Sequence, residues 1–263
     1  MPLADFEREV LRCLAANRNP DSFVGGVTVI HQSSASPRAS RDVDLFHDSE
    51  EALARSVEVD VAALRLAGFE IIEHQREATF CRASVTKGER QTKVEWVRDS
   101  AFRFFPVEAD LDLGWRLNFW DAATNKLLAL FGRHAFRDYV DVLYLHEHHL
   151  PLGALAWAAA GKDPGLTPEL IIDWAKRSTR YTPEEMQQVQ LSAPPDLRAM
   201  KPALLLAAEQ AEALFLRLPM AEVGCLYLDA AGKPVCPDPA TPDFLKLTRH
   251  FGSVKGAWPR TAN

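Results

Sequence analysis

The pattern of apolar residues changes along the chain near residue 118. Before that point, short runs rich in β-branched and aromatic residues alternate with amphipathic segments. After it the pattern is mainly helical, apart from a hairpin candidate at 223–237. A chain with this mixture predicts an α+β fold, in which a mixed β-sheet is flanked by helices and a mainly helical C-terminal region follows. We expect two domains, at 1–118 and 119–263.

Within the first part, the spacing of apolar residues predicts helices over 1–18 and 49–67. Ser49 is a favourable residue for the start of the second helix, and Gly68 for its end. A "KGER" turn joins the last two strand-like segments. The strand-like segments, which share β-branched and aromatic residues, lie at 23–32, 42–46, 69–86 and 92–97.

The overall charge limits the partners that the chain can attract from a distance. Its 263 residues carry a formal net charge of −6, so a contact with nucleic acid would need a local basic patch. No apolar run approaches the roughly 20 residues of a membrane span. The opening "MPLADFEREVLRCL" has neither the basic nor the apolar region of a signal peptide. We therefore expect a cytoplasmic protein without a membrane partner.

The spacing of the four cysteines also favours a cytoplasmic location. They lie too far apart in sequence for a CxxC motif and are best explained as isolated thiols in a reducing compartment. Cys225 and Cys236 flank the hairpin candidate, so a disulfide between these two remains an alternative. The four are Cys13, Cys81, Cys225 and Cys236.

Two aspartates stand one residue apart in the strand-like segment "DVDLF". Residues i and i+2 of a strand project from the same face, so Asp42 and Asp44 should point together. Two neighbouring carboxylates repel each other, and a divalent cation such as Mg²⁺ or Mn²⁺ removes that cost. The alternative is an exposed edge strand with both aspartates in water.

Other residues near the aspartates fit the same chemistry. Gly25 and Gly26 come shortly before them, and glycines allow a backbone to approach a triphosphate closely. Glu95, a lone acid inside the apolar run "TKVEWV", is a candidate third carboxylate. We expect Lys93 to face the other way. Alternatively, Glu95 pairs with a lysine or an arginine.

A second set of charged residues lies in "FWDAATNKLLALFGRHAFRDYVDVLYLHEHH", at 119–149. Lys126 and Arg133 are seven residues apart on one face of a predicted helix, and Asp138 and Asp141 share a face of the next. Cations of this kind can neutralise phosphate charge, and an acid can anchor them. The alternative is a network of ion pairs on a solvated helix.

Together these segments resemble a known family. "GGVTVIHQSSASPRASRDVDLF" and "NKLLALFGRHAFRDYVDVLYL" are similar, in that order, to two motifs of the AbiEii/AbiGii-type nucleotidyltransferase toxins, part of the polymerase-β-like nucleotidyltransferase superfamily. The resemblance spans about residues 20 to 150 and implies a nucleotidyltransferase-type sheet. The chain departs from the family at Val27, where a small hydroxyl residue is usual.

The resemblance also implies roles for individual residues. Asp42 and Asp44 would bind the metal, with Glu95 as the third acid, and the nucleotide would be surrounded by Gly25, Gly26, Thr28 and Ser40, with Arg38 matching a position before the aspartates. Lys126 would contact the triphosphate, and Asp138 would be an essential acid supported by Arg133 and Asp141.

The activity implied is metal-dependent transfer of a nucleoside monophosphate from a nucleoside triphosphate (NTP) to an acceptor hydroxyl, with release of pyrophosphate. In characterised family members the acceptor is a tRNA end, and the enzyme is the toxin of a toxin–antitoxin pair. Two alternatives remain open. One is a nucleotidyltransferase for an antibiotic-type small molecule, and the other is a non-catalytic nucleotide-binding or antitoxin-like module.

Two further segments have competing explanations. The histidines of "HEHH", at 146–149, could bind zinc, or could sit favourably at the C-terminal end of a helix. The segment 246–260 interleaves cations with Phe251 and Trp258, a composition that suits RNA. We expect an RNA acceptor to be held there, and the alternative is an ordinary basic tail.

Overall fold

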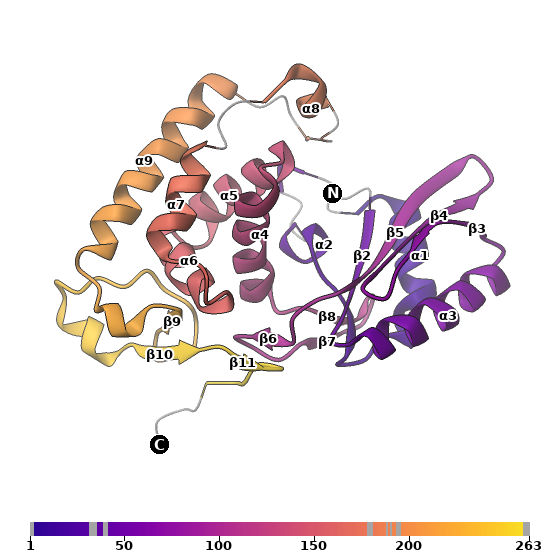
Figure 1. Cartoon of the computed structure of the whole chain (residues 1–263), viewed down its shortest axis with the longest axis horizontal. Helices are drawn as coiled ribbons and strands as arrows, with labels where there is room; N and C mark the ends of the chain where they lie inside the picture. The colour runs from indigo at the N-terminus through magenta and orange to yellow at the C-terminus, as the bar shows by residue number, and fades with distance from the viewer. Residues whose placement is uncertain are drawn as a thin grey trace. The chain divides into compact units, whose positions relative to one another are not determined.

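The structure is a computed structural model that describes residues 3–31, 36–38, 42–177, 181–187, 189, 191–192 and 196–259 (Figure 1). The chain divides into two compact units. The first comprises Met1–Ala101 and Pro106–Ala122, and the second comprises Phe102–Phe105 and Ala123–Asn263. Within the described residues, no helix is long and apolar enough to cross a membrane.

The first unit is built on one mixed sheet. Its strands are β1 (Ser22–Val24), β2 (Asp42–His47), β3 (Glu70–Arg76), β4 (Phe80–Lys87), β5 (Arg90–Arg98), β7 (Glu108–Asp110) and β8 (Gly114–Arg116). Among the described residues, seven strands lie in the order β3-β4-β5-β2-β1-β8-β7. Strand β2 runs parallel to β5, and β1 runs parallel to β8, while the other pairs are antiparallel. The expected mixed sheet with flanking helices is confirmed.

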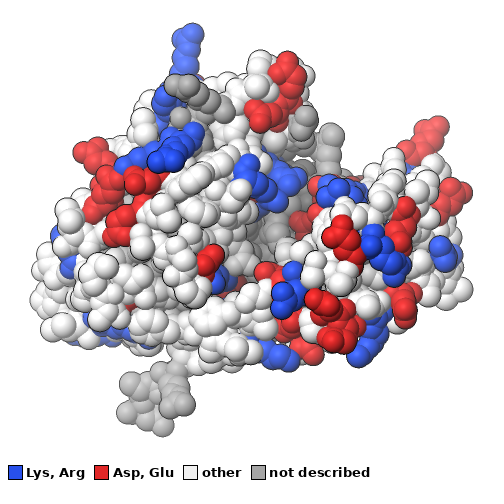
Figure 2. Space-filling view, in the orientation of Figure 1, with Lys and Arg blue, Asp and Glu red and all other residues white. Residues whose placement is uncertain are grey.

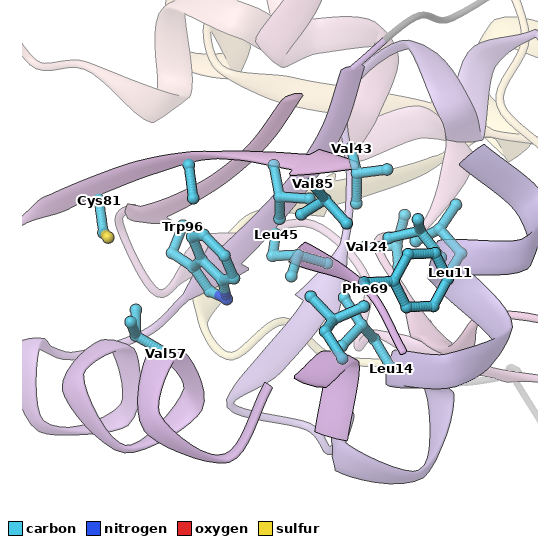
Figure 3. Close-up of a cluster of buried hydrophobic side chains, with 14 of the residues drawn as sticks. Leu11, Leu14, Val24, Val43, Leu45, Val57, Phe69, Cys81, Val85 and Trp96 are labelled. Atoms are coloured by element: carbon cyan, nitrogen blue, oxygen red, sulfur yellow. The ribbon is translucent and has the colours of Figure 1, made fainter. Parts of the chain in front are cut away.

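One face of this sheet is covered by helices α1 (Asp5–Leu14) and α3 (Glu50–Leu66). Alternate residues of β2 and β5 point into the core between sheet and helices, among them Val43, Leu45 and Trp96, all of them fully buried (Figure 3). Leu11 and Leu14 of α1 meet them there. The Ser49 hydroxyl accepts the Ala52 N–H at the start of α3, as expected from the sequence.

Two strand predictions were wrong in part. Among the described residues of the predicted strand 23–32, Phe23 and Val24 belong to β1, and Val27–Ile30 make a short helix, α2. Its β-branched residues favour strands only weakly, and the turn at Gly26 overrides that preference. The segment 69–86 is two strands, β3 and β4, because Glu77 and Phe80 exchange backbone hydrogen bonds in a turn between them.

The second unit is mainly helical, as predicted. Helix α4 begins in the first unit, because residues 119–122 belong to it. Helix α6 is buried along its whole length and packs against α7 and α9. The helices are α4 (Phe119–Arg133), α5 (Phe136–His148), α6 (Leu152–Ala159), α7 (Pro168–Arg177), α8 (Pro183–Gln187) and α9 (Leu197–Phe215).

Two short antiparallel pairs of strands complete this unit. Strand β9 (Cys225–Leu228) pairs with β10 (Thr248–Phe251), and β6 (Phe102–Arg103) pairs with β11 (Ser253–Val254). The hairpin expected at 223–237 is therefore only partly present, as a bridge from Leu228 to Pro234. Over its full length β9 pairs with β10, which comes later in the chain than the predicted hairpin partner. All four cysteines are free thiols.

A fully buried ion pair lies beneath the sheet of the first unit. Arg18 Nη2 donates to both carboxylate oxygens of Asp60, at 2.5 and 2.6 Å. Trp96 Nε1 on β5 donates to the same carboxylate at 2.8 Å, and Asn17 and Ser56 donate to it as well. Asp60 thus ties α3 to the sheet and to the segment after α1.

Removing the charge of Asp60 should therefore cost much stability. Asp60→Asn leaves Arg18 buried without its counter-ion, and we expect the free energy of unfolding to fall by about 3–5 kcal/mol. Asp112→Asn is the matched control, because its ion pair with Arg12 is more than half exposed and should contribute less than about 1 kcal/mol. Urea unfolding measures both variants. Equal losses would show that the buried ion pair of Asp60 contributes no more to stability than an exposed one.

The stability of the fold also depends on pH, through His47 at the end of β2. Burial, together with the nearby positive charge of Arg18, lowers the pKa of His47 from 6.5 to about 4. The unfolded chain therefore takes up a proton first, and stability falls as the pH drops from about 6.5 to about 4, by about 3 kcal/mol. Urea unfolding across this range should give a flatter profile for His47→Gln. Parallel profiles would contradict the assignment.

Candidate functional site

Asp42 and Asp44 lie on the same face of β2, opposite the face that carries the buried Val43 and Leu45. This confirms the shared face predicted from their spacing. The alternative of an edge strand is wrong, because β2 lies between β5 and β1 within the sheet. In the register of β2 and β5, Asp44 pairs with Glu95. Three carboxylates are thereby grouped on one side of two central strands.

The glycine pair lies directly against the second aspartate. The Gly25 N–H donates to the backbone oxygen of Asp44 at 3.2 Å. Gly26 has a φ of +64°, and a Cβ atom there would lie 2.5 Å from Asp44 Oδ2. At Gly25, a Cβ would lie 2.5 Å from the Phe46 ring. A Cβ atom at either position would force the Asp44 carboxylate or the Phe46 ring to shift, so the glycines allow the turn and the Asp44 carboxylate to share this space.

Two cations neutralise part of the carboxylate face. Arg82 Nε donates to Glu95 Oε1 at 2.8 Å, and Lys93 Nζ lies 3.3 Å from the same oxygen. Lys93 also pairs with Asp42 at 3.2 Å. The expectation that Lys93 faces away was wrong, because residues two apart in a strand share a face. Sequence reasoning missed both cations, although the spacing of Lys93 and Glu95 was a usable signal.

The donor atoms of this face fit Mg²⁺ with a limited set of protein ligands. Within the described part of the chain, no group of three or more His, Cys, Asp or Glu side chains is placed to hold a metal ion. Mg²⁺ is commonly bound by one or two carboxylates, with phosphate and water oxygens completing the shell. Asp42 and Asp44 meet that requirement. Glu95 is engaged by Arg82 and Lys93, so the pairing alternative describes its contacts here.

The other residues predicted near the nucleotide have different surroundings. Thr28 lies in α2 with 2% of its surface exposed. It lines a cavity with residues of α1 and of the β7–β8 turn, and none of the three grouped carboxylates lines that cavity. Arg38 is buried. Ser40 lies outside the described residues.

The charged residues of the second motif form a buried cluster in the second unit. Lys126 Nζ lies 3.0 Å from Asp138 Oδ1 and 3.1 Å from Asp141 Oδ2, and both aspartates are fully buried. Arg133 donates to both oxygens of Asp138, at 2.6 and 2.8 Å. The four residues come together as predicted, while a network on a solvated helix is wrong for all of them except the partly exposed Arg133.

The charges of this cluster determine the protonation state of Asp138. Burial alone would raise the pKa of Asp138, but the hydrogen bonds from Arg133 and the charge of Lys126 hold it below its ordinary value. The carboxylate is therefore charged and occupied as an anchor for two cations. The Arg133 side chain is 48% exposed, against 7% for Lys126. Arg133 is thus the more accessible cation for an anionic ligand.

The "HEHH" histidines are explained without zinc. His146 Nδ1 accepts the N–H of Leu152, the first residue of α6, at 3.0 Å. Burial lowers the pKa of His146, which keeps the ring neutral for this role. His148 and His149 pack on the Tyr144 ring.

Within the segment 246–260, residues 246–259 are folded into the second unit and include β10 and β11, and several of their basic side chains have partners. Arg249 donates to Glu222 and lies over the rings of Tyr227 and Phe244. His250 contacts the Phe104 carbonyl at 2.8 Å, and Lys246 pairs with Asp243. Arg260 lies outside the described residues. This segment is not a free basic tail.

Comparison with known proteins gives only distant similarities. No protein-family model matches the sequence, and no curated protein matches it. An H. pylori structure described as a "putative nucleotidyltransferase" aligns over 79% of this chain and 94% of its own, with 18% identity and a TM-score of 0.47.

Two other solved structures are also similar at low identity. JHP933 from Helicobacter pylori aligns over 80% of this chain and 92% of its own, with 19% identity and a TM-score of 0.47. Cid1, described as having RNA terminal uridylyl transferase activity, covers 65% of this chain and 47% of its own, with 14% identity and a TM-score of 0.28. All three TM-scores lie below 0.5.

The close approach of Gly26 to Asp44 can be tested with a matched pair of variants. Gly26 and Gly88 have nearly the same φ, +64° and +63°, but a Cβ at Gly88 would meet nothing within 4 Å. Gly88→Ala should cost about 1 kcal/mol of unfolding free energy from its backbone alone. Gly26→Ala should cost at least about 1 kcal/mol more, because its methyl group displaces Asp44. Urea unfolding measures both, and equal losses would exclude the steric contact.

Proposed function

We propose that the protein transfers a nucleoside monophosphate from an NTP to an acceptor hydroxyl, using Mg²⁺ or Mn²⁺ held by Asp42 and Asp44. The observation that carries this proposal is the contact between the Gly25–Gly26 turn and Asp44. A glycine turn lets phosphate oxygens approach the backbone, and the adjacent carboxylates fit the ion that accompanies those phosphates. The motif order, which resembles that of the AbiEii/AbiGii-type toxins, supports the same reaction.

In the proposed reaction the acceptor oxygen forms a bond to the α-phosphorus, and the bond from that phosphorus to the β-phosphate bridging oxygen breaks. Pyrophosphate leaves, and the hydroxyl proton passes to solvent water. A bound divalent ion would supply Lewis-acid polarisation of the phosphoryl oxygens and stabilise the attacking and leaving oxygens. Asp42 and Asp44 position that ion, and the glycine turn leaves room for the phosphates.

Cations of the chain have supporting roles in this proposal. Lys93 bridges Asp42 and Glu95, which limits repulsion on the carboxylate face before an ion binds. The predicted role of Arg133 as a nucleotide contact stays a prediction, and its side chain is the more accessible of the two cations of the second motif. The predicted contact of Lys126 with the triphosphate stays a prediction, since two buried aspartates engage its ammonium group.

Two classes of acceptor fit the proposed chemistry. The family resemblance favours a tRNA end, and with it a role as a toxin held in check by an antitoxin. Within 246–259, Glu222 engages Arg249 and Asp243 pairs with Lys246, which favours the second candidate, a small-molecule acceptor. On the face that Figure 2 draws, the described basic and acidic side chains are interspersed, which also gives a polyanion little attraction.

Transfer of label tests the proposal. The full chain is incubated with each α-labelled NTP and Mg²⁺, in parallel with total RNA and with aminoglycoside acceptors, and the products are separated. We expect one acceptor class to be labelled, and Asp44→Asn to reduce the rate by at least about 100-fold through loss of transition-state charge stabilisation. Removing Mg²⁺ with a chelator should have the same effect.

Glu73→Gln is the control, because Glu73 is also a carboxylate of the sheet but lies on β3, where it pairs with Arg76. It should label as the parent chain does. Transfer by Asp44→Asn at the parent rate would refute the assignment of the site. Label in the small molecule and none in RNA would select the second candidate.

A further inference from the structure

The cavity beside Thr28 in the first unit is separate from the carboxylate face. It has a volume of about 210 Å³ and lies among residues of α1, α2 and the β7–β8 turn. Its polar lining residues are Arg8, Thr28, Asp110 and Asp112. A volume of this size corresponds to roughly seven waters of liquid, enough for a small organic molecule.

The Thr28 hydroxyl is buried in this lining without a partner. The side chain is 2% exposed, and Oγ1 makes no hydrogen bond with any described residue. Buried hydroxyl groups in folded proteins are nearly always paired, because leaving one unpaired forfeits its hydration. A ligand acceptor in the cavity would satisfy Thr28.

Arg8 is the second unpaired donor of the lining. Its Nε is buried without a hydrogen-bond partner, and its side chain makes no ion pair among the described residues. Arg12, one turn further along α1, differs because it donates to Asp112 at 3.0 Å. A guanidinium that has no counter-ion beside a cavity favours an anion there.

The two aspartates of the lining do not oppose an anion, because each already has a partner. Asp112 is paired with Arg12, and Asp110 is paired with Arg116 at 3.2 Å. Asp110 also accepts the N–H groups of Asp112 and Leu113. Among the described residues, the charge left uncompensated at the cavity is that of Arg8.

We propose that this cavity binds a short-chain monocarboxylate. Its carboxylate would accept hydrogen bonds from Arg8 Nε and Thr28 Oγ1, and its alkyl part would pack against the apolar lining residues Leu3, Leu11 and Leu113. This site is independent of the proposed nucleotidyl transfer, because it contains none of Asp42, Asp44 and Glu95 and its occupation is measured as binding.

Titration of the full chain with butyrate at fixed ionic strength tests the proposal. Calorimetry should show binding of one butyrate per chain and a raised melting temperature. Butyramide, the neutral analogue, should bind at least about tenfold more weakly, because it lacks the charge that Arg8 pairs with. Inorganic phosphate has no alkyl part and should also bind more weakly. Absence of butyrate binding, or equal binding of butyramide or phosphate, would overturn the assignment.

Variants place the binding at the named residues. Arg8→Gln and Thr28→Val should each weaken butyrate binding by about tenfold or more, while Arg65→Gln, on α3 and outside the cavity lining, should bind as the parent chain does. Thr28→Val also tests the premise without any ligand. Removing an unpaired buried hydroxyl should raise the melting temperature of the ligand-free protein, whereas a lower melting temperature would show that Thr28 already has a partner. Butyrate binding unchanged in Arg8→Gln would refute the site.

Discussion

Strand β2 is held between two neighbouring strands, and successive side chains along it therefore point to opposite faces of the sheet. Val43 and Leu45 pack into a core with α1 and α3, so Asp42 and Asp44 must lie on the opposite face. A shift of one residue in the pairing of β2 with β5 would exchange the two sets and bury both carboxylates. The same hydrophobic contacts that stabilise the sheet therefore also determine where the carboxylates stand.

Each unit places a buried carboxylate at the point where several segments meet. Asp60 accepts hydrogen bonds from Arg18 and Trp96 in the first unit, and Asp138 accepts them from Lys126 and Arg133 in the second. A buried charge is tolerated only when donors surround it. Replacement of a single partner in either cluster removes structural support as well as charge, so lost activity in such a variant is not by itself a sign of catalysis.

Local spacing was enough to predict the features that depend on one element. The shared face of Asp42 and Asp44, the start of α3 at Ser49, and the common face of Lys126 and Arg133 all follow from strand or helix periodicity. Features that depend on contacts between distant segments could not be predicted in this way. Arg82 reaches Glu95 only because β4 pairs with β5, and Thr28 faces a cavity only because α1 and the β7–β8 turn surround it.

The pairing of β6 with β11 has a consequence for the order in which the chain folds. Phe104 beside β6 contacts His250 and also accepts the N–H of Ala257, and the first of these contacts joins residues 146 positions apart. During synthesis from the N-terminus, the strands and helices of the first unit emerge early and can pair with one another. Residues 102–105 must instead wait until their partners at 250–257 have left the ribosome. Their partners close a long loop, which makes completion of the second unit a late step with a high entropic cost.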